Sequence, residues 1–216
     1  MRMTARPTHP THRAAIVVDP QNDFTEGGAL AVEGGDAVCA RIGAHLVTAA
    51  ERYALVLFTS DWHIEPGDHF AGLEAPDFTD TWPVHCAAGT AGAAIDDEVV
   101  AGARVAGLDI ASPLALADGL VHKGQHEAAY SGFEGTDGDR ALHELLTRAG
   151  ITAVDVMGIA TSHCVRATAL DAVTHGYETS VLDDLCVGVT DELAAAARAD
   201  MISAGIVLTT STVPVG

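Results

Sequence analysis

Short apolar runs alternate with amphipathic segments along almost the whole chain. Residues 14–19 form a compact apolar run that ends in a carboxylate, which is typical of a buried parallel strand. Runs of the same kind predict further strands at residues 54–60, 120–123, 153–159, 177–182 and 206–209. Apolar residues at helical spacing predict helices at residues 35–53, 139–148, 163–175 and 191–204. Residues 94–117 fit either a helix or an irregular connection.

The order of these elements predicts the fold class. Strands that alternate with helices form a parallel sheet with helices on both faces, so we expect an α/β fold. A chain of 216 residues, of which 48% are apolar, can build one such core but is short for two. We therefore expect a single domain at residues 14–216, and a basic, turn-rich N-terminal tail at residues 1–13.

Charge and cysteine content narrow the classes of function. A formal charge of -19, with Lys123 as the only lysine, would repel phosphate backbones, so no nucleic-acid partner is expected. No apolar run approaches the ~20 residues that span a bilayer, so no membrane partner is expected either. The first apolar run is also too short for a secretory signal. The four cysteines are widely spaced, which favours free thiols and a cytoplasmic location over a disulfide framework.

Residues that can carry chemistry follow several of the predicted strands. Asp19, Asp61 and Lys123 stand at the ends of the first three strands, and residues 160–164 follow the fourth. The carboxyl ends of parallel strands share one edge of the sheet, where sites form, so we expect these residues to meet. Residues 62–93 form a long loop without periodicity, and such a loop in a compact domain is usually functional.

Cys164 is the candidate nucleophile. Ser162 is a candidate N-cap, which would place Cys164 in a first helical turn, where free N–H groups stabilise a thiolate and can hold an oxyanion. A buried structural cysteine would fit this position equally well. Asp19 could be the base that a thiol nucleophile needs, with Lys123 as the cation that keeps it ionised, or the two could form a simple surface ion pair.

A second candidate site is a metal centre in the long loop. Asp61, His63, His69 and His85 offer one carboxylate and three imidazoles, a suitable ligand set for one divalent ion such as Zn²⁺, Fe²⁺ or Mn²⁺. A lone histidine is usually structural, but this grouping in an aperiodic loop favours metal binding.

Several blocks of the sequence resemble the nicotinamidases/pyrazinamidases, which belong to the isochorismatase-like cysteine hydrolase superfamily. The blocks are VDPQNDF at 18–24, SDWH at 60–63 with DHF at 68–70, TWPVHCAAGT at 81–90, KGQHEAAYSGFEG at 123–135 and GIATSHCVRATALDA at 158–172. They occur in the order of the family and cover most of the chain between residue 14 and about residue 184. The first and last blocks are typical of the superfamily, whereas the metal and WPxHC blocks indicate the nicotinamidase branch.

The resemblance implies a fold and a reaction. The fold would be a three-layer α/β/α domain with a mainly parallel six-stranded sheet. The reaction would be hydrolysis of nicotinamide, and also of pyrazinamide, to the acid and ammonia through a cysteine thioester, as part of NAD salvage. The implied catalytic residues are Asp19, Lys123 and Cys164.

The resemblance also assigns the remaining site residues. The metal ligands would be Asp61, His63 and His85, with His69 at a position that ligates in some members only, and the metal would take the pyridine nitrogen of the substrate. A cis peptide bond before Ala160 would direct its N–H into an oxyanion hole beside the N–H of Cys164. The implied lining of the substrate pocket is Phe24, Trp82 and Tyr130.

Two stretches depart from the family pattern. The family usually has a proline directly after DWH, whereas Ile64 stands here and the proline comes at Pro66. Residues 92–117 match no family block, and the number of subunits is left open, an oligomer included.

Other functions stay open on the residues alone. An amidase of the same superfamily that acts on a carbamoyl or ureido group is the main alternative, but those branches typically lack the metal histidines at positions 63 and 85. Isochorismatase proper lacks the cysteine nucleophile. A non-catalytic metal-binding or thiol-redox protein would have no need for Asp19 and Lys123.

Overall fold

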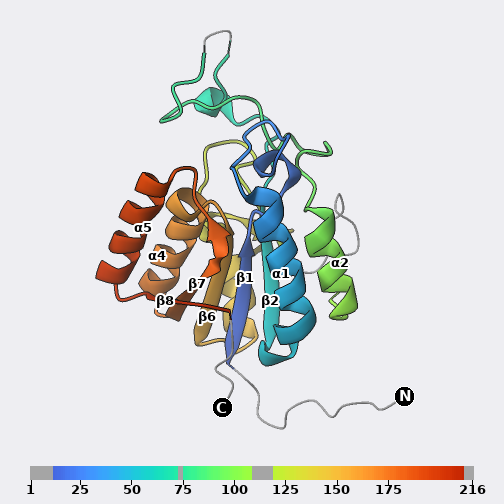
Figure 1. Cartoon of the computed structure of the whole chain (residues 1–216), viewed down its shortest axis with the longest axis vertical. Helices are drawn as coiled ribbons and strands as arrows, with labels where there is room; N and C mark the ends of the chain where they lie inside the picture. Colours follow the sequence, from blue (N-terminus) through green and yellow to red (C-terminus); the bar gives the residue numbers. More distant parts are fainter. Residues whose placement is uncertain (1–11, 73–74, 109–118, 212–216) are drawn as a thin grey trace.

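The computed structural model describes residues 12–72, 75–108 and 119–211. They form three layers, a central sheet with helices on both of its faces (Figure 1). Within these ranges six strands run parallel in the order β3–β2–β1–β6–β7–β8, which confirms the predicted mainly parallel sheet. Residues 14–18 of the central strand β1 are completely buried. The parallel strands are β1 (Arg13–Val18), β2 (Leu55–Asp61), β3 (Leu120–Lys123), β6 (Ala153–Ile159), β7 (Glu178–Val187) and β8 (Val207–Thr209).

A short antiparallel hairpin extends the sheet beyond β3. It consists of β4 (Thr136–Asp137) and β5 (Arg140–Ala141), and it brings the sheet to eight strands within the described ranges. The sequence pattern did not predict this hairpin, because two residues are too few to show an alternation of apolar and polar positions. Strand β1 begins at Arg13, a residue that the pattern had assigned to the N-terminal tail.

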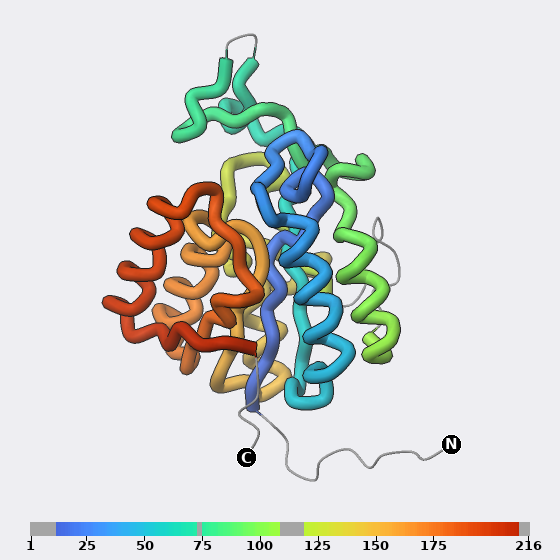
Figure 2. Tube along the Cα trace, viewed as in Figure 1, coloured from blue at the N-terminus to red at the C-terminus, as the bar shows by residue number. Residues whose placement is uncertain are grey.

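The strand order determines which helices cover which face. The chain moves from β1 to β2 in one direction and from β6 to β7 in the other, so right-handed crossovers place the connecting helices on opposite faces. Figure 2 shows residues 35–49 beside residues 97–105, and residues 166–174 beside residues 191–203, as two separate stacks of tubes. A stacking contact between His143 and His175 adds residues 142–148 to the second group. One group is α1 (Gly35–Ala49) with α2 (Asp97–Val105), and the other is α3 (Leu142–Arg148) with α4 (Arg166–Thr174) and α5 (Asp191–Ser203).

Strands β1 and β6 mark the point where the strand order reverses, which is where α/β sheets form their sites. Asp19 follows β1 directly, and a π-helical turn at Thr161–Val165 follows β6. Gly158 lets the two strands approach here, because a Cβ atom at this residue would lie only 2.0 Å from the carbonyl oxygen of Val18. Its φ of +134° is also one that other residues rarely adopt.

Some predicted elements have different limits in the structure. Helix α1 ends at Ala49 and continues as a 3₁₀ turn at Ala50–Arg52, so the predicted helix at residues 35–53 is close to its observed extent. Strand β7 runs beyond its predicted end at residue 182, because Asp183 and Asp184 are accommodated in it by hydrogen bonds from Arg198 and Ser211. The ambiguous stretch at residues 94–117 contains α2, while residues 109–118 lie outside the described residues.

Candidate active site

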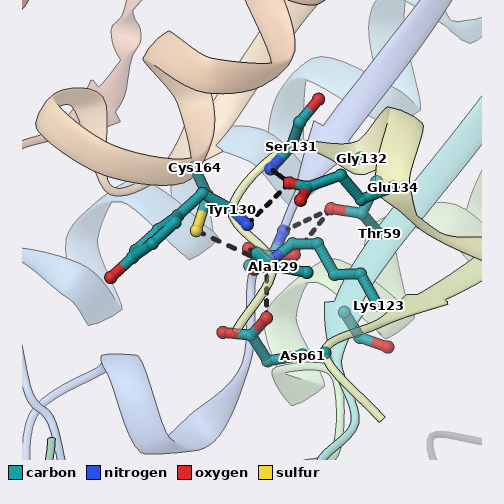
Figure 3. A network of polar contacts seen from close by, with 12 residues as sticks. Thr59, Asp61, Lys123, Ala129, Tyr130, Ser131, Gly132, Glu134 and Cys164 are labelled. Atoms are coloured by element: carbon teal, nitrogen blue, oxygen red, sulfur yellow. Dashed lines mark hydrogen bonds and ion pairs between the residues drawn. The ribbon is translucent and has the colours of Figure 1, made fainter. Parts of the chain in front are cut away.

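The strand ends bring the predicted catalytic residues together around Lys123. Its Nζ atom lies 2.9 Å from Oδ2 of Asp19. Nζ also lies 3.5 Å from Sγ of Cys164 and contacts a carboxylate oxygen of Asp61 (Figure 3). The carbonyl oxygen of Ala129 accepts a further hydrogen bond from Nζ at 3.0 Å. The side chains of Lys123 and Asp19 are fully buried, so the expectation of these residues in one cluster is met and a surface ion pair is excluded.

Asp19 is fixed by the neighbouring strand β2. The hydroxyl of Thr59 donates a hydrogen bond to Oδ1 of Asp19 at 2.6 Å, and the N–H of Asp19 donates to the carbonyl oxygen of Thr59 at 3.2 Å. The φ of Asp19 is +44°, a left-handed conformation that aspartate tolerates better than most residues. Burial raises the pKa of the Asp19 carboxyl, and Lys123 opposes the rise. A carboxylate with a raised pKa is a better base at neutral pH.

Cys164 lies in the π-helical turn at Thr161–Val165, and the capping interaction predicted for Ser162 is wrong. The turn is wider than an α-helical one, with the N–H groups of His163 and Val165 both donating to the carbonyl oxygen of Ala160. Ser162 is therefore inside the turn, where its hydroxyl is hydrogen-bonded to Nδ1 of His163 at 2.9 Å instead of capping the helix.

The thiol of Cys164 is not a ready-made thiolate. Burial raises the pKa of Cys164 well above its ordinary value, Lys123 opposes the rise, and the carboxylates of Asp19 and Asp61 add to it. The loss of solvent thus favours the neutral thiol and opposes the expected stabilisation of a thiolate by the helix N-terminus. Attack by this sulfur therefore requires a base, and the nearby carboxylate of Asp19 is suitable.

The backbone beside Cys164 has the conformation that the family resemblance implied. The peptide bond between Ile159 and Ala160 is cis. Ala160 and Cys164, the two residues of the implied oxyanion hole, both line the same cavity.

Three histidines from the long loop form a second cluster next to Asp61. Ring nitrogens of His63, His69 and His85 all lie within 4.8 Å of one another, and Nε2 of both His63 and His85 lies 4.0 Å from Oδ2 of Asp61. All four predicted metal ligands are therefore adjacent and buried. Nδ1 of His63 donates to the carbonyl oxygen of Gly124 at 2.5 Å, which leaves its Nε2 as the free coordinating atom.

The histidine cluster fits a divalent metal ion. Among the described residues, Nε2 of His63 and Nδ1 of His69 are buried and have no hydrogen-bond partner. Burial lowers the pKa of both imidazoles to about 4, so they are neutral at physiological pH. Nδ1 of His85 is hydrogen-bonded to the carbonyl oxygen of Pro83 at 2.8 Å. Neutral imidazoles with unpaired nitrogens around a carboxylate are a donor set for Zn²⁺, Fe²⁺ or Mn²⁺.

A cavity of about 330 Å³ connects the thiol with the histidine cluster. Phe24, Trp82 and Tyr130 all line it, as the resemblance implied, and Nε1 of Trp82 donates a hydrogen bond to the hydroxyl of Tyr130 at 3.2 Å. His163 completes this wall, edge-on to Trp82 at a ring distance of 5.7 Å. Sequence analysis gave His163 no role, although its place next to Cys164 was a usable signal.

Two further residues that the sequence analysis left without a role position the site. The side-chain amide of Gln21 donates to the carbonyl oxygens of Asp61 at 2.8 Å and of Ala93 at 2.9 Å, and its oxygen accepts from the N–H of Asp61 at 2.8 Å. Asp23 accepts a hydrogen bond from the N–H of Cys86 at 2.6 Å, next to His85. Their position in the VDPQNDF block could have indicated this bracing role.

Comparison with known proteins agrees with the motif blocks. A family model described as Isochorismatase domain matches residues 13–213. The chain belongs to the isochorismatase domain family. Among its relatives, the nicotinamidase/pyrazinamidase of Mycobacterium tuberculosis is 44% identical over 200 residues, which cover 92% of this chain and 99% of the relative.

Solved structures of the same family share the fold. The pyrazinamidase of Pyrococcus horikoshii, in complex with zinc, matches with a TM-score of 0.73 at 35% identity and covers 92% of this chain and 99% of its own. A protein of L. infantum in complex with nicotinate matches with a TM-score of 0.74 at 30% identity, over 94% of this chain and 93% of its own. As for membranes, the described part of the chain contains no helix that is both long and apolar enough to cross one.

Proposed function

We propose that this isochorismatase-family protein hydrolyses nicotinamide to nicotinate and ammonia. The observation that carries the proposal is one cavity lined by Cys164, which has a buried carboxylate next to it, and by members of a cluster of imidazoles with unpaired ring nitrogens. The first pair suits acyl transfer from an amide. The second suits a substrate that carries a ring nitrogen, and nicotinamide combines both features.

Acylation of Cys164 would begin with proton transfer to Asp19. As Asp19 takes the thiol proton, the sulfur attacks the amide carbon, and Lys123 at 3.5 Å from Sγ stabilises the charge on the sulfur. The N–H groups of Ala160 and Cys164 would hold the resulting oxyanion. Asp19 then gives the proton to the amide nitrogen, ammonia leaves, and a nicotinoyl thioester stays on Cys164.

Deacylation would use the same base. The carboxylate of Asp19 accepts a proton from a water molecule as the water oxygen attacks the thioester carbon. Asp19 then returns that proton to the leaving sulfur, and the nicotinic acid that forms releases its own proton to solvent as nicotinate. Lys123 stays charged through both steps, because Asp19 and Asp61 raise its pKa well above the ordinary value although burial lowers it. A permanent positive charge keeps Asp19 oriented and in its basic form.

We further propose that Asp61, His63 and His85, with His69 as a fourth candidate, hold one divalent metal ion. Such an ion would supply a coordination position for the pyridine nitrogen and so orient the amide toward Cys164. Zinc, iron and manganese all suit this ligand set. The zinc-bound pyrazinamidase of Pyrococcus horikoshii supports zinc as one of them.

The proposed substrates include pyrazinamide, whose ring also carries a nitrogen at the corresponding position. The product nicotinate would feed NAD salvage. All four cysteines are free and buried in the structure, which supports a reducing cytoplasmic location, and the subunit number is left open.

The test is ammonia release from nicotinamide by purified protein, with metal analysis of the same sample. Carbamoyl and ureido substrates should be assayed beside nicotinamide to separate the alternative amidases. We expect rapid ammonia release from nicotinamide and about one metal ion per chain. Metal-loaded protein that leaves nicotinamide intact but hydrolyses a ureido substrate would disprove the proposal.

A further inference from the structure

The cavity changes character between its inner end and its mouth. The buried inner end carries Cys164 and three of the candidate metal ligands, Asp61, His69 and His85, with His85 only 3% exposed. At the mouth, the lining residues Phe78, Val189 and Leu193 are 59%, 46% and 47% exposed. All three of these are apolar, so the mouth offers an apolar surface beyond the groups that would hold nicotinamide.

Phe78 is held at the mouth by a tight turn. Its φ of +57° is unusual for a bulky residue and is maintained only where the surroundings enforce it. Oδ1 of Asp77 accepts hydrogen bonds from the N–H groups of Thr79, Asp80 and Thr81, each at 2.9 Å. The ring of Phe78 meets that of Trp82 edge-on at 6.1 Å, so this wall is a built feature rather than a loose side chain.

The other wall is fixed by a helix cap. Thr190 caps α5, and its hydroxyl oxygen accepts a hydrogen bond from the N–H of Leu193 at 3.2 Å. The residues on either side of this cap, Val189 and Leu193, both line the cavity. Two separate chain segments, each fastened by local hydrogen bonds, therefore present apolar side chains to the same opening.

The cavity is also larger than nicotinamide requires. Its volume of about 330 Å³ lies in the range of pockets that hold drug-sized ligands, whereas nicotinamide is one six-membered ring with one amide group. A ring held by its nitrogen at the histidines and by its amide at Cys164 has both anchors at the inner end. Carbon 5 is the ring position furthest from both anchors, so it faces the mouth.

We infer that Phe78, Val189 and Leu193 form an outer apolar subsite that binds an apolar substituent on carbon 5 of a nicotinamide-type substrate. The inference rests on the proposed function, and it extends the substrate class to 5-alkyl pyridine carboxamides. Burial of one methylene group typically improves binding about three- to fourfold. Because these walls are half exposed, two additional methylene groups should together gain about as much as one fully buried methylene, about fourfold.

The experiment compares 5-propylnicotinamide with 5-methylnicotinamide, since both alkyl groups change the electronic character of the ring in nearly the same way. Wild-type protein should show a kcat/KM about fourfold higher for the propyl compound. Phe78→Ala and Leu193→Ala should each bring this ratio close to one. The two substitutions lie in separate walls of the mouth, so a folding defect in one variant leaves the other as a test. Ile202→Ala is the matched control, because Ile202 is an exposed residue of the same helix that does not line the cavity, and it should keep the wild-type ratio.

The outcomes separate the subsite from the proposed function. Hydrolysis of nicotinamide with a propyl-to-methyl ratio of one or below overturns the subsite and leaves the function intact. A ratio that falls as far in Ile202→Ala as in the two wall variants has the same meaning. If no amide is hydrolysed, the proposed function fails. Calorimetric titration of Cys164→Ala with the two compounds then decides the subsite, because tighter binding of the propyl compound supports it and equal or weaker binding overturns it.

Discussion

The carboxylate of Asp19 and the ammonium group of Lys123 lie 2.9 Å apart, with both side chains completely excluded from solvent. Lys123 also contacts Asp61, so one buried cation joins the candidate base to the candidate metal site. Two carboxylates and one ammonium leave this cluster with an excess of negative charge. A divalent cation beside Asp61 would reverse that excess and so favour the thiolate of Cys164, which connects metal binding with the reactivity of the sulfur.

Asp19→Asn should lower turnover at least about a hundredfold, because general acid–base help is typically worth about 10²–10⁴ in rate. Nicotinamide binding should be largely retained, since the metal ligands and the aromatic walls are unchanged. Breaking a buried ion pair can lower the free energy of unfolding by ~3–5 kcal/mol. The remaining contact of Lys123 with Asp61 should keep this loss of stability near the lower value. Steady-state kinetics with a melting curve test this. A well-folded variant within about tenfold of wild-type turnover would remove Asp19 from the role of base.

Cys164→Ala should abolish amide hydrolysis while leaving the fold and the metal content intact. The reason is that Cys164 supplies the sulfur to which the acyl group is transferred, whereas its side chain is not needed to hold the histidines. Activity, metal content and melting temperature should be measured on one preparation. Residual turnover above a few per cent of wild type would exclude Cys164 as the nucleophile.

His85→Ala should lose the metal and raise the KM for nicotinamide, because the ring nitrogen of the substrate would lose its anchor. His126→Ala is the matched control, since His126 is an exposed histidine in the part of the chain that follows β3. Metal analysis and KM should be determined together. Full metal occupancy with an unchanged KM in His85→Ala would show that His85 is not a ligand.

Metal affinity should depend on pH in a way that reflects burial of the ligands. The pKa values of His63 and His69 are lowered from 6.5 to about 4, so protons compete with the metal for these two nitrogens only below about pH 4. After removal of the metal with a chelator, metal affinity should be measured at pH values between about 4 and 7. The contribution of these two residues to the affinity should not change with pH above about pH 5. A contribution from these two residues that already falls steeply near the ordinary imidazole pKa of about 6.5 would contradict the effect of burial on them.

Gln21→Ala should destabilise the protein and weaken metal binding together. The substitution leaves the buried N–H and carbonyl groups of Asp61 without their side-chain partner, at about 1–3 kcal/mol for each unsatisfied group. The free energy of unfolding should be measured in urea, with metal content as the second readout. A loss below about 0.5 kcal/mol with full metal content would show that Gln21 has no bracing role.

The sequence could predict the parts of this molecule that depend on regular patterns. The six parallel strands follow from short apolar runs, and the meeting of Asp19, Asp61 and Lys123 follows because three of these runs lead directly into a charged residue. The structure overturned the capping role of Ser162, because a cap depends on the exact width of the first helical turn, which side-chain types do not determine. Gln21 acts through hydrogen bonds to backbone groups distant in sequence, and no local pattern reports those.

The burial of Lys123 has a practical consequence for chemical labelling. Because it is the only lysine of the chain, and only 1% of it is exposed, the protein presents no side-chain amine to amine-directed reagents while it is folded. Acylation of this amine can occur only when a local opening exposes Nζ to solvent. The rate at which an activated ester modifies Lys123 would therefore report opening of the catalytic centre, free of background from any other lysine.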